Sequence, residues 1–174
     1  METHRVARQG EPHAKQDAVD AIISQWQRAR PDLQTAPMEV FGRIYRLSRE
    51  MGDRMEKTYQ RFGIGRGEFD VLAVLRRAGE PYTVSPRELT ATLMLTTGGM
   101  TGRLDKLERA GLVQRSPDPA DRRGLRVTLT PEGLSVIDQA VGTGLEEQAK
   151  VFAGMEPERI EQLNELLREL LAAM

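Results

Sequence analysis

The chain has 174 residues, no cysteine and a formal net charge of -1 at pH 7. This length suits one moderate domain, or one domain with an added element, and the missing cysteines exclude disulfides, thiolate zinc sites and a cysteine nucleophile. No apolar stretch approaches the length of a membrane span and the N-terminus has no signal-peptide core, so we expect a cytoplasmic protein with no membrane partner.

The first predicted elements are helices. A polar segment with several helix breakers, residues 1–14, is expected to be disordered. Apolar residues at helical spacing predict an extra N-terminal helix within residues 15–35, before a second, longer helix that runs from Pro37 to Gly63. A third helix is predicted over Arg66 to Arg77, because Ala78-Gly79 and a nearby proline form a common stop signal.

The next stretch predicts a helix-turn-helix. In the segment SPRE, residues 85–88, the serine can cap a helix, the proline suits its first turn, and the glutamate completes a reciprocal capping box. This short helix is expected to reach about Leu93. After a break at Leu95-Thr96, the segment TGGMTGRLDKLERAGL predicts a second helix closed by Gly111. Two short helices joined by a tight turn are typical of a helix-turn-helix.

A hairpin is predicted to follow the helix-turn-helix. Leu112–Arg115 and the alternating segment Leu125–Leu129 read as strands on either side of a turn rich in proline and aspartate. Thr130 then begins a long helix, and Pro157 begins a final helix rich in leucine. The predicted fold class is therefore mainly α with a small β-wing, a winged helix-turn-helix between N- and C-terminal helical regions.

Positive charge gathers on this winged segment. Between Thr96 and Arg126 there are seven basic and four acidic residues, a local charge of +3 in a chain of -1. A helix fits the major groove of DNA, and arginines on a hairpin tip suit a narrow minor groove. The alternative is a hairpin whose charges are simply solvated. The residues that we expect to contact DNA are Ser85, Thr96, Thr97, Thr101, Lys106, Arg122 and Arg123.

An enzyme is a poorer interpretation of this sequence. No histidine lies beyond the N-terminal segment, and the chain has neither a P-loop nor a G-x-G-x-x-G motif, so the usual parts of hydrolytic and nucleotide-dependent catalysis are missing. We expect no catalytic residue, metal site or resident cofactor. A winged helix that binds another protein remains as an alternative, although the basic hairpin favours DNA.

The segment SPRELTATLMLTTGGMTGRLDKLERAGLVQRSPDPADRRGLRVTLTPEG closely resembles the winged helix-turn-helix of the multiple antibiotic resistance regulator (MarR) family. Asp121-Arg122-Arg123-Gly124 matches the family's D-x-R-x wing, and the helix pattern extends the match over residues 37–174. The resemblance implies a ligand-responsive transcriptional regulator, in most cases a repressor, that binds double-stranded DNA as a homodimer. Residues 36–65 and 130–174 would then form the dimerisation region, and two lobes of residues 66–129 would read a palindrome.

The extra N-terminal helix makes the chain similar to the urate-responsive (PecS-like) subgroup, whose ligand positions are matched by Trp26, Asp70, Arg103 and Arg115. The resemblance implies that Trp26 and Arg103 hold an anionic purine, urate or xanthine, while Arg115 and Asp70 form a charge pair that rearranges. Indole stacking and a planar guanidinium fork suit such a ligand. A phenolic effector stays open, as do an anchoring role for Trp26 and a structural salt bridge from Asp70 to Arg115 or Arg103.

One departure from the family concerns the predicted recognition helix. Gly102 stands where family members commonly carry a larger polar residue, and Gly98 and Gly99 lie one turn earlier. Each glycine weakens a helix by about 1 kcal/mol relative to alanine. Together they permit a close approach of the backbone to DNA but leave fewer side chains to read bases.

Overall fold

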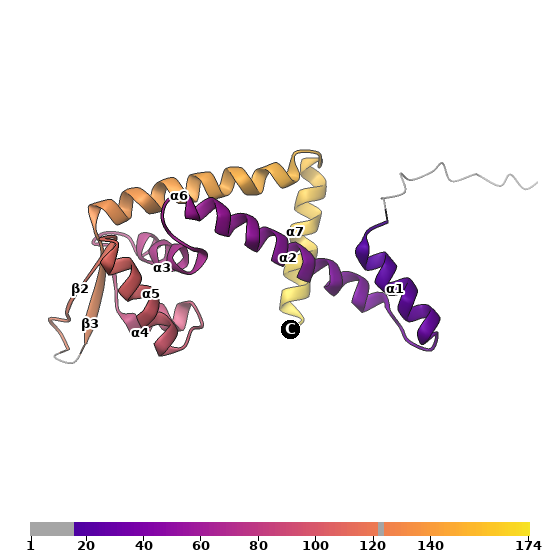
Figure 1. The fold of residues 1–174 in the computed structure, drawn as a ribbon, viewed down its shortest axis with the longest axis horizontal. Coiled ribbons are helices and arrows are strands. Elements are labelled where there is room, and N and C mark those ends of the chain that lie inside the picture. The colour runs from indigo at the N-terminus through magenta and orange to yellow at the C-terminus, as the bar shows by residue number, and fades with distance from the viewer. Residues whose placement is uncertain (1–15, 122–123) are drawn as a thin grey trace, which may run out of the picture. The chain divides into compact units, whose positions relative to one another are not determined.

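The computed structural model describes residues 16–121 and 124–174 and divides into two compact units (Figure 1). The first unit reaches to Glu50 and the second comprises Met51–Met174. Helix α2, Ala36–Gln60, contributes to both units. The segment 1–14, predicted to be disordered, and the wing residues Arg122 and Arg123 lie outside the described residues.

In the first unit, α1 (Ala18–Ala29) packs on the N-terminal half of α2. Asp17 caps α1 and forms a capping box with Asp20, and Arg43 of α2 pairs with these two carboxylates at 2.8 and 2.6 Å. A Cβ built on Gly42 would lie 3.1 Å from a methyl group of Val19, so this glycine lets α1 approach closely. The extra helix predicted from the sequence is therefore present and anchored by charge as well as by apolar contact.

The second unit contains the predicted winged helix-turn-helix and the C-terminal helices. The fold class predicted from the sequence is confirmed, and α3 has the predicted bounds. The unit adds a short strand and a 3-10 turn, neither of which the sequence indicated. Its elements after α2 are α3 (Arg66–Arg77), β1 (Thr83–Val84), α4 (Pro86–Thr92), α5 (Thr97–Arg109), β2 (Val113–Pro117), β3 (Leu125–Leu129), α6 (Pro131–Ala149), η1 (Lys150–Phe152) and α7 (Pro157–Ala172).

The strands form one antiparallel sheet in the order β1-β3-β2. Strands β2 and β3 are the predicted hairpin, with Val113 opposite Leu129 and Pro117 opposite Leu125. Strand β1 is only two residues long and pairs Thr83 with Thr128 on the other side of β3. The hairpin thereby becomes part of a three-stranded sheet that is fixed to the helices, and it extends from them as a wing (Figure 1).

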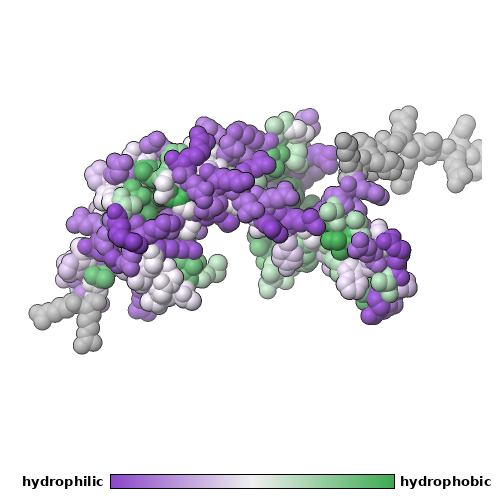
Figure 2. All heavy atoms as spheres, viewed as in Figure 1, coloured by the Kyte–Doolittle hydropathy of each residue, from purple (hydrophilic) through white to green (hydrophobic). Residues whose placement is uncertain are grey.

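The hydrophobic core of this lobe is built around α3, which buries an unbroken apolar run from Val71 to Leu75. Helices α4, α5 and α6 and strand β3 each add side chains to the same cluster. The visible face of the lobe is largely hydrophilic over this core (Figure 2). The largest side chains that are fully buried are Leu72, Leu75, Leu89, Met100, Leu107, Ile137, Val71 and Val127.

The start of α6 is tightly joined to the end of the helix-turn-helix. Thr130 caps α6 by accepting a 3.0 Å hydrogen bond from the Gly133 amide, and its hydroxyl donates to the Gly111 carbonyl at 2.7 Å. The Thr130 amide donates to the Leu112 carbonyl at 3.1 Å. A Cβ on Gly133 would lie 1.9 Å from that same Leu112 oxygen, so only glycine permits this approach.

The C-terminal helix α7 leaves much apolar surface exposed. None of its residues is buried, and Leu166 and Leu171 are 62% and 71% exposed. Hydrophobic residues are visible in this part of the space-filling view (Figure 2). Across the described ranges 16–121 and 124–174, no helix combines the length and apolarity that crossing a membrane requires.

Candidate functional site

Both helices of the helix-turn-helix begin with capping hydroxyl groups. The Ser85 hydroxyl accepts from the Glu88 amide at 3.2 Å and donates to the Glu88 carboxylate at 2.7 Å, which confirms the predicted capping box. The Thr96 hydroxyl accepts from the Gly99 amide at 3.2 Å. Ser85 and Thr96 are both expected to contact DNA. In the structure their hydroxyl groups cap the N-termini of α4 and α5.

The second helix, α5, has one buried face and one bare face. Met100, Leu104 and Leu107 are buried against the lobe. On the exposed side, a Cβ built on Gly98 or Gly102 would meet no atom within 4 Å. The structure therefore presents backbone, not long side chains, along this part of the predicted recognition helix.

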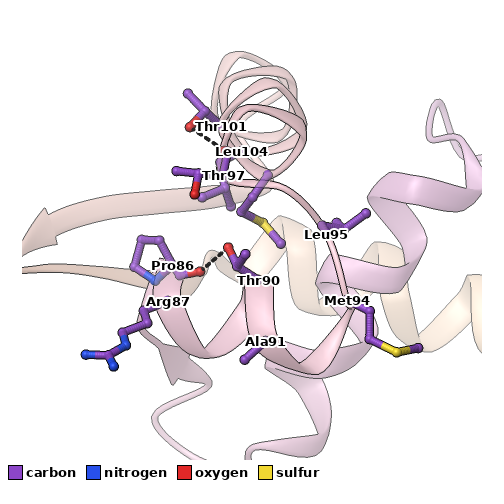
Figure 3. A pocket seen from close by; sticks show the side chains of 10 residues that line it. Pro86, Arg87, Thr90, Ala91, Met94, Leu95, Thr97, Thr101 and Leu104 are labelled. Atoms are coloured by element: carbon purple, nitrogen blue, oxygen red, sulfur yellow. Dashed lines mark hydrogen bonds between the residues drawn. The ribbon is translucent and has the colours of Figure 1, made fainter.

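A groove of about 580 Å³ separates α4 from α5 (Figure 3). Thr97 and Thr101 line it from α5, and Pro86, Arg87 and Thr90 line it from α4, with the end of the Arg87 side chain directed away from α5 (Figure 3). The Thr101 hydroxyl donates to the Thr97 carbonyl at 3.0 Å. Both threonines predicted to reach DNA are therefore exposed at the beginning of α5 and share one edge of this groove.

Arg103 joins α5 to α3. Its Nη1 donates to the Gly67 carbonyl at 3.2 Å and lies 3.9 Å from Asp70, with 28% of the side chain exposed. The structure thus brings together two of the four predicted ligand residues, Arg103 and Asp70. A structural ion pair between Asp70 and Arg103 is one of the alternatives that the sequence leaves open, and the structure contains this pair.

Lys106, one turn further along α5, also faces α3. Its Nζ lies 3.1 Å from Glu68, whose side chain is only 11% exposed and also accepts a 2.8 Å hydrogen bond from the Gly65 amide. Burial opposes the ionised form of Glu68, but Lys106 and the Gly65 amide more than offset it and lower the pKa of Glu68. In the structure the ammonium group of Lys106 is paired with the carboxylate of Glu68. A contact between Lys106 and DNA stays a prediction.

The prediction of an Arg115–Asp70 charge pair is wrong in this structure. The Arg115 guanidinium lies 2.7 Å from Asp105 and donates through Nε to Glu108 at 2.9 Å. The Arg115 amide also donates to Glu108 at 3.0 Å, and these hydrogen bonds lower the pKa of Glu108. The reason is the reversal of the chain at Gly111, which folds β2 back alongside α5 and places Arg115 beside two carboxylates of that helix.

Asp70 has an environment unlike that of the other carboxylates. Its pKa is raised because burial opposes ionisation, and the cations of Arg103, Arg66 and Arg77 only partly offset this effect. Half of the side chain, 51%, is exposed, so the energetic effect is screened by solvent. The ionised form of Asp70 is therefore less favourable in the folded protein than in the unfolded chain.

We expect Asp70→Asn to stabilise the fold at neutral pH by less than about 1 kcal/mol, since the amide removes the charge at this partly buried position. A carboxyl group whose folded pKa is raised destabilises the folded state above that pKa, and the penalty disappears as pH falls through it. Urea unfolding at neutral and acid pH, with the exposed Asp53→Asn as control, checks this result. A gain that persists in acid would contradict it.

The base of the wing is held by Asp118. Its carboxylate accepts from Arg126 Nε at 2.8 Å and from the Ala120 amide at 2.9 Å, and its own amide donates to the Gly124 carbonyl at 3.0 Å. The residues that flank the wing tip are therefore ordered by local hydrogen bonds. The predicted DNA contacts Arg122 and Arg123 lie between them, outside the described residues.

Trp26 lies on α1 in the first unit and is 42% exposed. It is therefore not a buried core residue of that unit, and the neighbouring Ile22 is 37% exposed. The other three predicted ligand residues belong to the second unit. The role of Trp26 in binding a ligand stays a prediction.

Within the ranges that the structure describes, no group of three or more acidic or histidine side chains could hold a metal ion.

Sequence reasoning missed the partners that orient the predicted site. Glu68 could have been found from the Gly65–Glu68 spacing, which is that of a capping box. Glu108 could have been found from its position just before the Gly111 reversal. The closeness of Gly67 to Arg103 has no local signal, because the two residues meet only through the packing of α3 on α5.

Comparisons with known proteins agree with this geometry. A family model described as the MarR family matches residues 62–124. The HTH-type transcriptional regulator PecS of Dickeya dadantii is 36% identical over 149 residues, which cover 86% of this chain and 90% of PecS.

Two solved structures share the fold. A MarR variant from E. coli in complex with operator DNA has a TM-score of 0.67 at 24% identity, over 84% of this chain and 97% of that one. BpsR of Bordetella bronchiseptica, described with the regulation of its DNA binding by 6-hydroxynicotinic acid, has a TM-score of 0.58 at 26% identity, over 74% and 98% of the two chains.

Proposed function

Because the chain belongs to the MarR family of transcriptional regulators that bind operator DNA, we propose that it acts as a repressor that an anionic purine, urate or xanthine, releases from its operator. In this proposal the protein binds a palindromic operator as a homodimer. The observation that carries the effector response is the Arg103–Asp70 contact, since it joins the guanidinium group on α5, the helix that would read DNA, to a carboxylate on α3.

The exposed apolar residues near the C-terminus support the homodimer. Leu145 on α6 is 60% exposed, and α7 carries further leucines at the surface. Monomeric proteins rarely expose a large contiguous apolar patch, because its burial against a partner is favourable. A second copy of the chain would cover this surface and place two winged lobes on the two halves of a palindrome.

Operator binding would use two elements of each lobe. The start of α5, with Thr97 and Thr101 beside the open Gly98 and Gly102, would enter the major groove. Arg122 and Arg123 would enter the adjacent minor groove, where the negative potential is strongest in narrow stretches. Together these contacts would let a chain with a net charge of -1 bind a polyanion.

The effector would act through Arg103. A flat purine anion would take the planar donor fork of this residue, and Trp26 of α1 would supply an aromatic face for stacking. The negative charge of the bound purine would be repelled by Asp70, so purine binding would favour a different arrangement of α3 and α5. A ligand releases DNA only if it binds that second arrangement more tightly. BpsR, whose DNA binding is described as regulated by 6-hydroxynicotinic acid, supports a small heterocyclic acid as the class of ligand.

Titrating urate into the protein bound to an operator selected from random duplexes tests this function. We expect operator affinity to fall at least about tenfold, a typical coupling between two sites. Trp26→Ala should abolish the response without changing affinity in the absence of urate, and Trp26→Phe should retain part of it. Operator affinity that is unchanged at millimolar urate would refute the urate response.

Three further outcomes separate the alternatives. Release by a phenolic acid but not by urate would favour the phenolic effector. Loss of the ultraviolet absorbance band of urate during incubation would instead indicate catalysis. Binding to duplex DNA that is insensitive to salt would favour a protein-interaction module, because phosphate contacts make affinity fall steeply with salt.

A further inference from the structure

Gly67, the second residue of α3, lies directly beneath the guanidinium group of Arg103. A Cβ built on this glycine would be 2.8 Å from both Cζ and Nε of Arg103 and 3.2 Å from Nη2. The two separations of 2.8 Å are shorter than real Cβ contacts, so the guanidinium group would have to move away from a side chain at this position. The arginine of the recognition helix can therefore occupy its observed position only because residue 67 has no side chain.

The same glycine also binds the arginine. Its carbonyl oxygen accepts a hydrogen bond from Arg103 Nη1 at 3.2 Å, and Asp70 lies 3.9 Å away on the next turn of α3. The guanidinium is therefore held by a bare backbone surface, one carbonyl and one carboxylate. We call this group of contacts, made by Gly67 and Asp70, the arginine seat.

The arginine seat lies beside a second link between the same helices. Lys106 is three residues after Arg103 on α5 and pairs at 3.1 Å with Glu68, the residue after Gly67. Residues three apart lie on the same face of a helix. Two cations on one face of α5 are thus bound by consecutive residues of α3, and together they fix how far α5 is rotated about its axis.

We infer that Gly67 is a positioning residue for operator binding, because it seats Arg103 and so sets the rotation of the recognition helix that presents Thr97 and Thr101. The effect of Gly67 on DNA passes through Arg103 alone. Displacing the arginine from its seat would produce the arrangement of α5 that has low affinity for the operator.

Gly67→Ala is a clean way to displace the arginine. Residue 67 is inside a helix and has no positive φ, so alanine fits the backbone and is the better helix former. The atoms that must move belong to the end of a long, flexible side chain, which can turn into solvent. Gly67→Ala should therefore change operator affinity without lowering the stability of the fold.

A double-mutant cycle on the full-length protein tests the inference. We expect Gly67→Ala to weaken operator binding about tenfold without lowering the Tm, a coupling in the usual range for linked sites. In an Arg103→Ala background, Gly67→Ala should have no further effect on affinity. Unchanged affinity for the single variant would overturn the inference. So would an equal loss in both backgrounds, because the methyl group would then act without the arginine.

The Arg103→Ala background is the matched control, because the methyl group added at residue 67 then has no guanidinium group to displace. A second measurement rests on the proposed function. If urate acts through Arg103, the Gly67→Ala protein should start at low affinity and respond little to urate. A wild-type protein that ignores urate would refute the proposed effector, whereas the cycle without urate would still decide the role of Gly67.

Discussion

Replacing Gly133 with alanine is expected to lower the free energy of unfolding by about 3 kcal/mol, the upper end of the usual penalty for overpacking. The new methyl carbon would fall 1.9 Å from the Leu112 carbonyl oxygen. That oxygen belongs to the backbone and already accepts the Thr130 amide at 3.1 Å, so it cannot move without breaking the junction of α6 with the wing. The better helix propensity of alanine, about 1 kcal/mol, offsets only part of this loss.

Urea unfolding at a fixed protein concentration measures the effect, because the stability of an oligomer depends on concentration. Gly142→Ala lies on the same helix and meets no neighbouring atom, so it should leave stability unchanged or raise it slightly. If Gly133→Ala were as stable as this control, the close contact with Leu112 could not be a real constraint on the fold.

Substituting both Arg122 and Arg123 with alanine should weaken operator binding about a hundredfold, since a specific arginine contact is typically worth 1–3 kcal/mol. The loss should be accompanied by a shallower dependence of affinity on salt, by about one unit of slope for each phosphate contact removed. Asp118 and its hydrogen bonds to Ala120 and Arg126 hold the base of the wing without these arginines. Stability should therefore change little.

The adjacent pair Arg76 and Arg77 provides a control with the same change in charge. These residues end α3, where Arg76 forms a partly exposed ion pair with Asp138 at 2.7 Å. Their double replacement by alanine should reduce operator affinity far less than the wing variant, in binding assays at two salt concentrations. Equal losses would mean that overall charge, and not a contact made by the wing, controls affinity.

Local signals in the sequence predicted most of the helices. The bounds of α3 and the capping box at Ser85 agree with prediction, because caps, stop signals and helical periodicity depend on neighbours along the chain. Strand β1 was missed for the opposite reason. Two residues, Thr83 and Val84, become a strand only through pairing with β3, more than forty positions away.

The candidate site likewise contains residues that the sequence predicted and partners that only the folded structure shows. The residue types at Asp70 and Arg103 were identified from the sequence, and an ion pair between them was one of the alternatives. The partners of Arg115 were not, since Asp105 and Glu108 reach it only after the chain has reversed at Gly111. The seat at Gly67 depends on how two helices pack, which no local pattern encodes.

The attachment of Arg115 to Asp105 and Glu108 has a mechanical consequence for the winged lobe. It ties the strand that leads into the wing directly to the helix that would lie in the major groove. A tilt of that helix would carry the neighbouring hairpin with it, so contacts in the two grooves would be made or lost together. The winged lobe would therefore leave its DNA target in one step, with no intermediate in which only the wing is bound.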